Sequence, residues 1–154
     1  MDEERQTWCR SLKRELSFRF LSEEQTNLLA PMLECRRLVP GEKLWDMGRI
    51  CQGVGFIVNG RLDVRKPTNI PEKSVLLARL GPGSFVGEFC LLGEAEPPVE
   101  VAAPEGADLL FLSSESFVRL KKEAPEVAVQ LLQGMLLTVS KRLGQAYDRI
   151  AALF

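Results

Sequence analysis

The chain has 154 residues, of which 45% are apolar and 27% are charged, and its formal net charge is −1. This length suits one domain with a proper core and terminal helices, and the composition is that of an ordinary globular protein. The near-neutral charge and the lack of a long Lys and Arg run argue against direct binding to nucleic acid or to an anionic membrane surface.

The N-terminus and the cysteines narrow the possibilities further. The acidic start 1–5 has no apolar signal-peptide core, and no stretch reaches the length of a membrane span, so we expect a cytoplasmic protein. The four cysteines are Cys9, Cys35, Cys51 and Cys90. They form no C-x-x-C pair, and the chain has no histidine, so we expect no metal site and no disulfides. Four reduced thiols that pack as small apolar side chains are the expectation.

Residues 1–34 are predicted to be a helical segment that covers the domain behind it. Apolar side chains recur there at three- and four-residue spacing, at Trp8, Leu12, Leu16, Phe20 and Leu21. This spacing predicts helix between residues 6 and 30. Ser22 and Gln25 have the spacing of a capping box and predict the start of a second helix that runs through Met32.

Residues 35–112 read as short strands separated by turns. Pro40-Gly41 predicts a turn between strands 35–39 and 42–45, and Asn59-Gly60 between two apolar segments predicts a β-hairpin with a type I′ turn. Further strands are expected at 74–80, 99–102 and 108–112, with an exposed loop at 66–73. About eight strands with turns roughly every ten residues predict a jelly-roll-like barrel or sandwich.

The stretch from Leu80 to Ala103 carries the strongest signal for a binding site. Gly87-Glu88 follows a strand-like segment and precedes the apolar run 89–92. These residues predict one short helical turn whose backbone N–H groups face a ligand. Such a turn is a candidate phosphate site.

Residues 113–154 are predicted to form two helices. Ser113 or Ser114 caps a short helix at 115–122, and Pro125 suits the first position of a long final helix. Apolar residues recur along this last helix at spacings of four and three, at Leu132, Leu136, Val139, Leu143, Ala146, Ile150 and Leu153. This narrow seam favours a homodimer through parallel helices, and packing within the same chain is the alternative. Gly134 and Gly144 weaken the helix by about 1 kcal/mol each.

Two motifs resemble the cyclic nucleotide-binding domain, the β-roll of catabolite activator proteins and kinase regulatory subunits. Residues 86–91 match the first half of its phosphate-binding cassette, F-G-E-x-A-L, and the early β-roll pattern is matched by Pro40, Gly41, Glu42, Leu44, Phe56, Ile57, Gly60, Leu62 and Val64. The resemblance covers about residues 22–154. It implies a mainly β fold, a jelly-roll-like β-roll with N-terminal helices and a long C-terminal helix, which dimeric members use for association.

The resemblance also implies a ligand site at Gly87, Glu88, Phe89, Cys90, Leu91, Pro97, Pro98 and Val99. In the family the glutamate at the Glu88 position binds the ribose 2′-hydroxyl, and backbone amides hold the phosphate, here those of Gly87, Glu88, Cys90 and Leu91. The family's second cassette half, R-[ST]-A-x-V, is not matched, because Pro97 or Pro98 stands in place of the arginine.

The missing arginine is expected to weaken the binding of an anion. A hydrogen bond to a charged group contributes about 1.5–3 kcal/mol, and a guanidinium donates two to one phosphate. Repulsion from nearby carboxylates is expected from Glu94, Glu96 and Glu100. A replacement cation from a neighbouring strand is possible at Arg61, Arg65 or Arg79, although their spacing does not show it.

These observations lead to three hypotheses about function. The chain is predicted to be a stand-alone regulatory or sensory module that lacks the phosphate-pairing arginine, binds a different small ligand or binds one weakly, and acts through a protein partner. The alternative is a weak but genuine cyclic AMP- or cyclic GMP-binding signalling protein.

An enzyme is not expected, because Cys90 is the only candidate nucleophile and has no base nearby in the sequence. Direct DNA recognition is not expected either, because no helix-turn-helix follows the final helix. We expect no cofactor beyond a cyclic nucleotide or another small ligand.

Overall fold

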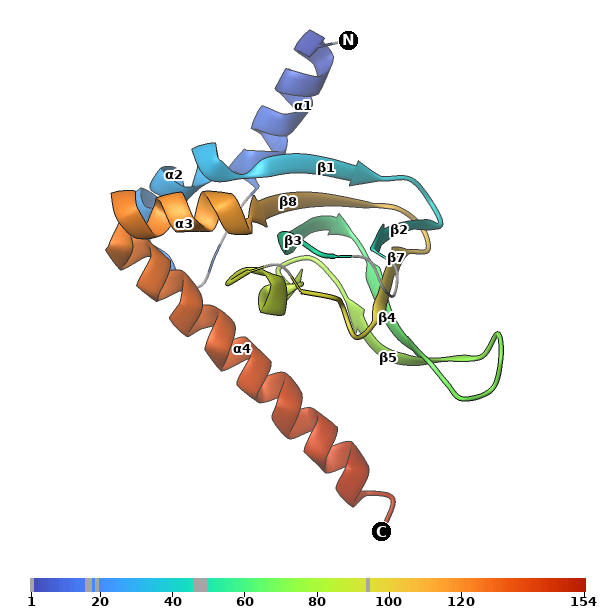
Figure 1. Cartoon of the computed structure of the whole chain (residues 1–154). Coiled ribbons are helices and arrows are strands. Elements are labelled where there is room, and N and C mark those ends of the chain that lie inside the picture. The colour runs from blue at the N-terminus through green and yellow to red at the C-terminus, as the bar shows by residue number, and fades with distance from the viewer. Residues whose placement is uncertain (1, 16–17, 19, 46–49, 94) are drawn as a thin grey trace.

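The computed structural model describes residues 2–15, 18, 20–45, 50–93 and 95–154, so that the predicted Leu16 and Glu94 positions lie outside the described residues. Two four-stranded antiparallel sheets form a β-roll, with strand orders β1-β8-β3-β6 and β2-β7-β4-β5 (Figure 1). The strands are β1 (Glu34–Leu38), β2 (Glu42–Trp45), β3 (Gly53–Gly60), β4 (Leu62–Pro67), β5 (Ser74–Leu80), β6 (Phe85–Val86), β7 (Glu100–Ala103) and β8 (Ala107–Ser113). This architecture confirms the predicted β-roll.

Helices flank the roll at both ends of the chain. They are α1 (Asp2–Arg14), α2 (Glu23–Leu29), α3 (Ser114–Glu123) and α4 (Pro125–Ala151), with short 3₁₀ turns η1 (Ala30–Met32) and η2 (Glu88–Cys90). The capping box is confirmed, because the Gln25 N–H donates to Ser22 Oγ and the Ser22 N–H donates to Gln25 Oε1. The first helix differs from the prediction: it starts at Asp2 and ends at Arg14, before Phe20 and Leu21.

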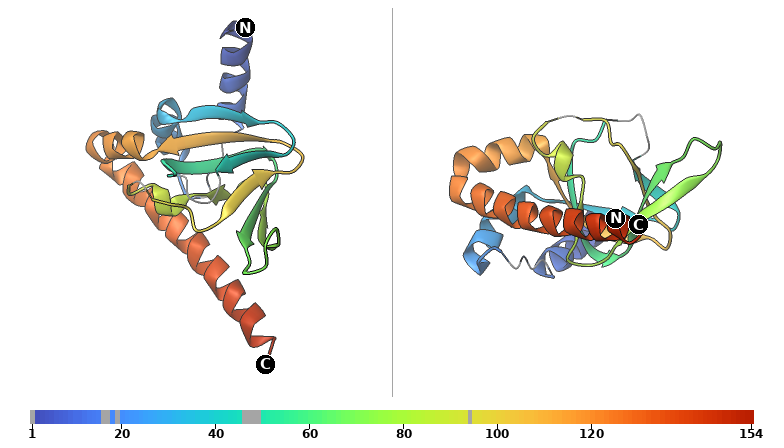
Figure 2. Two further views of the ribbon diagram at one scale, coloured as in Figure 1. Left: turned by 45° about the vertical axis from the view of Figure 1, so that its right-hand side comes forward. Right: turned by 90° about the horizontal axis from the view of Figure 1, so that it is seen from below.

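Two apolar clusters form the core. One cluster packs the helices against the sheet of β1, β3, β6 and β8, and it includes Leu12, Leu112, Phe117 and Leu131. The other lies within the roll and includes Trp45, Leu62, Cys90 and Val101. Figure 2 shows α1 on the β1 side of the roll and α4 running along its side to the opposite end. The described residues contain no helix that is both long enough and apolar enough to cross a membrane.

The predicted β-hairpin at Asn59-Gly60 is wrong. Strands β3 and β4 lie in different sheets, and β3 pairs with β8 through its last residue, Gly60. Gly60 has a φ of +83°, and a Cβ there would lie 2.8 Å from the Ala107 Cα. Among the described residues other than glycine, only Glu72 has a positive φ, so Asn59 does not adopt the conformation of a type I′ turn. The Gly60 backbone therefore turns the chain from one sheet to the other.

The expectation of four reduced, unpaired thiols is also wrong. The structure pairs Cys9 with Cys35 and Cys51 with Cys90 as disulfides. The partners are 26 and 39 residues apart in the sequence, and their Cα atoms are 5.6 and 5.8 Å apart. Both Cα separations are typical of disulfides. Cysteine spacing along the chain did not reveal these pairs, because the fold brings the partners together.

Helix α4 begins at Pro125 as predicted, and its two halves have different surroundings. Val127, Leu131 and Met135 are buried against the first core cluster. Gly134 faces the Phe20 ring so closely that an added Cβ would overlap it. The last turns of α4 extend beyond the roll, with the C-terminus at the opposite end of the molecule from the N-terminus (Figure 1).

Candidate ligand-binding site

The first half of the cassette is a short strand followed by a tight turn. Strand β6 pairs with β3 at Val86 and Phe85, and the chain then enters η2 through Gly87. Gly87 has a φ of +89°, in the left-handed region. A Cβ at this position would lie 2.5 Å from the Trp45 ring and 2.7 Å from the Gly53 carbonyl oxygen. Only glycine fits this backbone without displacing its neighbours.

Buried side chains pack against the turn. Cys90 and Leu91 are 0% and 1% exposed, and the Trp45 and Phe89 rings meet edge to face with their centroids 6.3 Å apart. The Cys90 N–H donates to the Gly87 carbonyl over 2.9 Å, and the Leu91 N–H donates to the Glu88 carbonyl over 3.2 Å. These two amides, expected to contact a ligand, thus make hydrogen bonds within the turn.

The predicted ligand residues fall into three groups by exposure. Gly87, Cys90, Leu91 and Pro97 are buried; Glu88 and Val99 are half-buried; Phe89 and Pro98 are exposed. The buried residues determine the shape of the cassette. The predicted ligand residues that are at least partly exposed are Glu88, Phe89, Pro98 and Val99, and their contact with a ligand stays a prediction.

The cations near the second cassette half differ from those the sequence suggested. Arg61 and Arg79 both approach the buried Asp63, with Nε to Oδ1 distances of 3.4 and 3.8 Å. Lys66 on β4 instead reaches the loop, where its Nζ donates to the Pro98 carbonyl oxygen over 3.2 Å. Lys66 therefore places a positive charge beside the backbone of Pro98, in the second half of the cassette.

Arg142 of α4 is a further residue of the site, which the sequence reasoning missed. Its guanidinium donates to Ser84 Oγ over 2.6 Å and to the Phe85 carbonyl oxygen over 2.9 Å, and it lies over the Phe85 ring at 4.6 Å. Burial lowers the pKa of Arg142 from its ordinary value, and the negative charge of Glu88 opposes this shift. Arg142 thus links the final helix to the strand that leads into the cassette.

Nothing in the sequence identified Arg142, because its partner Ser84 lies 58 residues away along the chain. Ser84, its hydrogen-bond partner, also lines a hollow of about 280 Å³ together with Phe18, Phe56 and Gly83. Arg142 itself does not line this hollow, so among the described residues the Arg142 contact and the hollow share Ser84 alone.

The predicted dimer seam divides between two environments. Leu132 and Val139 pack partly against the core, and Ala146 is half-buried. Leu136, Leu143 and Ile150 are 67%, 50% and 55% exposed. Tyr147 is exposed as well and lies four residues after Leu143 and three before Ile150. The exposed apolar stripe of α4 consists of Leu136, Leu143, Tyr147 and Ile150. The predicted Leu153 is 80% exposed but lies beyond the end of α4 at Ala151, and the dimer stays a prediction.

Comparison with known proteins identifies the family. The family described as "Cyclic nucleotide-binding domain" matches residues 35–124. The cyclic AMP receptor protein of Thermus thermophilus is 31% identical over 115 residues, which are 74% of this chain and 52% of that protein. Neuropathy target esterase sws of Drosophila mojavensis is 24% identical over 146 residues, which are 88% of this chain and 10% of the esterase. The chain thus spans about half of one relative and a tenth of the other.

A solved structure shows the same fold. The cyclic nucleotide-binding domain from Methylobacillus flagellatus superposes with a TM-score of 0.79 at 22% identity, and the match covers 93% of this chain and 80% of that one. The early β-roll motif and the Gly87 turn lie inside the matched residues 35–124. The chain belongs to the cyclic nucleotide-binding domain family.

Proposed function

We propose that this chain is a regulatory or sensory module that binds a small ligand at the cassette in an altered way and acts through a protein partner. One observation carries the proposal: the left-handed Gly87 turn is kept, whereas Pro97 or Pro98 stands where the family has its arginine. The buried half supports the proposal because its Gly87 turn matches the first half of the family's cassette. The other half lacks the bidentate guanidinium that would hold a phosphate.

Two cations partly compensate for the missing arginine in this proposal. Lys66 donates to the Pro98 carbonyl, and Arg142 donates to Ser84 and Phe85 beside the cassette. The carboxylates of Glu96 and Glu100 repel an anionic ligand, although Glu100 forms an ion pair with Lys43 at 3.3 Å. A lysine acts as a point charge without a planar fork, so it holds a phosphate with less geometric specificity than an arginine does. We therefore expect weak binding of an anionic ligand.

The second candidate is a weak but genuine cyclic AMP or cyclic GMP sensor. The half-buried Glu88 favours it, because the residue follows Gly87 as in the family cassette and can accept a hydrogen bond from a ribose hydroxyl. Isothermal titration of the purified chain with cyclic AMP and cyclic GMP separates the two candidates. Saturable heat at micromolar to millimolar ligand supports the sensor. No heat at millimolar ligand eliminates it and leaves the module for a different ligand.

The module is proposed to act without catalysing a reaction. Cys90, the one nucleophile considered from the sequence, is 0% exposed and paired with Cys51, so it offers no accessible thiolate. The match to the esterase relative covers only 10% of that protein, so the similarity does not imply esterase activity for this chain. Selective labelling of Cys90 by a thiol reagent in the oxidised protein would contradict this part of the proposal.

The partner is proposed to include a second copy of the chain, bound through the exposed apolar stripe of α4. A parallel pairing of two such helices would cover Leu136, Leu143 and Ile150, which are half or more exposed in one chain. Sedimentation of Leu143→Glu tests this, with Gln145→Glu on the opposite face of the helix as the control. A dimer in wild type and in the control, and a monomer in Leu143→Glu, is the expected result. An unchanged mass in all three proteins contradicts the dimer.

A further inference from the structure

The two disulfides differ in their exposure to solvent. Cys51 and Cys90 are 4% and 0% exposed and belong to the core cluster inside the roll. Cys35 is 9% exposed, and its partner Cys9 on α1 is only half-buried. A reagent in solution therefore has access to the Cys9–Cys35 bond but is shielded from the Cys51–Cys90 bond.

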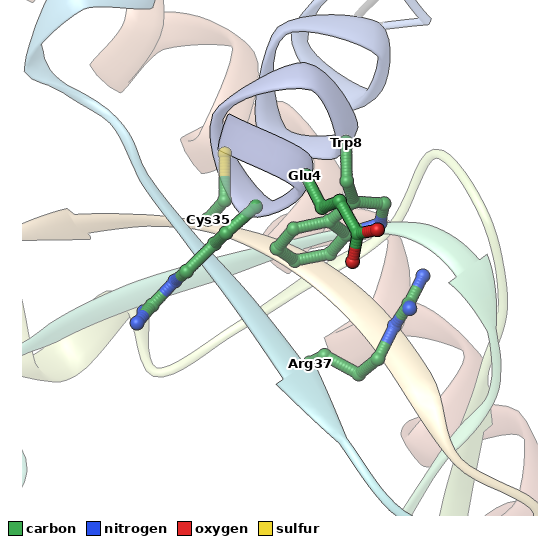
Figure 3. Close-up of a pocket in the computed structure, with 5 residues that line it drawn as sticks. Glu4, Trp8, Cys35 and Arg37 are labelled. Atoms are coloured by element: carbon green, nitrogen blue, oxygen red, sulfur yellow. The ribbon is translucent and has the colours of Figure 1, made fainter. Parts of the chain in front are cut away.

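Open hollows lie beside the Cys9–Cys35 bond. One hollow of about 410 Å³ is lined by Glu4, Arg5, Trp8, Cys35 and Arg37 (Figure 3). A second hollow of about 470 Å³ is lined by both cysteines, together with residues of α1 and β1. These volumes are in the range of small-molecule pockets. In Figure 3 the Cys35 sulfur points from β1 toward α1, at the edge of the first hollow.

The charges around the first hollow suit thiol chemistry. Arg5 and Arg37 line it together with one carboxylate, Glu4. Arg37 is held in place by its ion pair with Asp108, to which its Nε donates over 2.7 Å, and its guanidinium lies 4.6 Å from the Trp8 ring centre. Nearby arginines stabilise a thiolate. Exchange is faster when the departing sulfur is stabilised as a thiolate. The hollow thus combines an accessible disulfide, room for a small molecule and two guanidinium groups, of which Arg5 forms no ion pair within the described residues.

We propose that Cys9–Cys35 is a thiol–disulfide exchange site for low-molecular-weight thiols, whereas Cys51–Cys90 is a protected disulfide that supports the cassette. The thiolate of the incoming molecule attacks the Cys9 sulfur, the bond between the two protein sulfurs breaks, and Cys35 leaves as a thiolate. A second thiol then attacks the mixed disulfide and releases Cys9 with formation of the low-molecular-weight disulfide. Two thiols are oxidised, the two cysteines are reduced, and the two protons pass to the cysteine sulfurs.

Opening this bond changes the attachment of α1. The helix is joined to β1 by the disulfide, and its non-covalent contacts among the described residues include the buried Leu12, the Trp8 ring beneath Arg37 and a hydrogen bond between Trp8 and Asp108. After reduction the helix is held by non-covalent contacts alone. Hydrogen exchange of the α1 amides is therefore expected to speed up, whereas the cassette, held by Cys51–Cys90, is expected to change little.

The test follows the four sulfurs separately. The full chain is oxidised in air, exposed to reduced glutathione, trapped with iodoacetamide at successive times, and mapped by peptide mass spectrometry. Cys9 and Cys35 are expected to become alkylated roughly tenfold faster than Cys51 and Cys90. Equal rates, faster opening of Cys51–Cys90, or no cross-linked Cys9–Cys35 peptide in the oxidised protein each overturn the proposal.

Matched variants connect the chemistry to α1. Reduction is expected to accelerate amide exchange in α1 of wild type and of the Cys51→Ala/Cys90→Ala variant. In Cys9→Ala/Cys35→Ala, the α1 amides are expected to exchange at the fast rate under both conditions. Reduction that leaves α1 exchange unchanged in wild type overturns the proposed consequence. No ligand is used in these measurements, so their outcome is independent of the proposed function.

Discussion

The two halves of the cassette are specified by different kinds of interaction. In the first half, Gly87 lies against Trp45 and the Gly53 carbonyl, and Cys90 and Leu91 are fully buried. In the second half Pro97 is buried, but Glu96 and Pro98 are exposed and Glu100 forms an ion pair at the surface. Packing thus fixes the backbone of the first half whether or not a ligand binds. The second half has less packing to preserve, so its charge can change while the fold is kept.

Helix α4 repeats this contrast on a larger scale. Its N-terminal half buries Val127, Leu131 and Met135 in the core. Its C-terminal half exposes Leu143 and Ile150 and has Arg142 in contact with the strand before the cassette. In both regions the buried part determines the shape, and the exposed part carries the groups available to a ligand or partner.

The largest effect is expected from Gly87→Ala. The new Cβ would meet Trp45 at 2.5 Å and would hold alanine at a φ of +89°. Strain and overpacking together are expected to lower the free energy of unfolding by about 3 kcal/mol. Urea unfolding at neutral pH measures this loss.

Gly83→Ala is the matched control for that measurement. Gly83 has a φ of +87°, but nothing lies within 4 Å of its added Cβ. Only the backbone strain applies there, so a loss of about 1 kcal/mol is expected. Equal losses in the two variants would show that packing against Trp45 does not specify the first cassette half.

The second largest effect is expected from Pro98→Arg, which restores a guanidinium to the other half. Pro98 is exposed, so the longer side chain has room, and two hydrogen bonds to a phosphate are expected to improve cyclic nucleotide affinity by about 2 kcal/mol, or roughly thirtyfold. Titration calorimetry with cyclic AMP and cyclic GMP measures the change. Pro98→Gln has no positive charge and serves as the control. Equal affinities of the Arg and Gln variants would contradict a site limited by the missing cation.

A smaller effect is expected from Arg142→Gln. If α4 supplies part of the compensating charge, this variant is expected to bind an anionic ligand about tenfold more weakly, or about 1.4 kcal/mol. Arg149→Gln is the control, because Arg149 lies one heptad further along α4 and donates to the Leu77 carbonyl on β5 rather than to the cassette region. The same loss in both variants would indicate a general effect of net charge.

The sequence predicted the features that depend on local patterns. The Ser22 capping box and the Pro125 helix start follow from cap residues and apolar spacing, and the β-roll follows from the spacing of strands and turns together with the family resemblance. All three are present. Contacts between distant segments were not predictable in this way. The Cys9–Cys35 pair and the Arg142 contact join residues 26 and 58 positions apart, and neither leaves a mark on local spacing.

The Asn59-Gly60 hairpin failed for a related reason. The dipeptide signals a reversal of the chain, and Gly60 does have a positive φ. Which strands pair afterwards is decided by the sheets, where β8 pairs with β3 and β4 pairs with β5 and β7. In the cassette, too, the local sequence predicted the turn at Gly87. It did not predict which cations lie near the turn, because tertiary structure decides that.

The smallest effect is expected from Gly144→Ala, in the exposed half of α4. Nothing lies within 4 Å of the added Cβ, so the variant gains helix propensity alone and is expected to be more stable by about 0.8 kcal/mol. Gly134→Ala, in the buried half, gains the same propensity but forces the Phe20 ring to move, so a net loss of about 1 kcal/mol is expected. Thermal and urea unfolding measure the change in the free energy of unfolding of each variant, and the two changes are expected to have opposite signs. If both substitutions stabilise the protein, the Phe20 ring moves at little cost in free energy. Packing at Gly134 would then not distinguish the buried half of α4 from the exposed half.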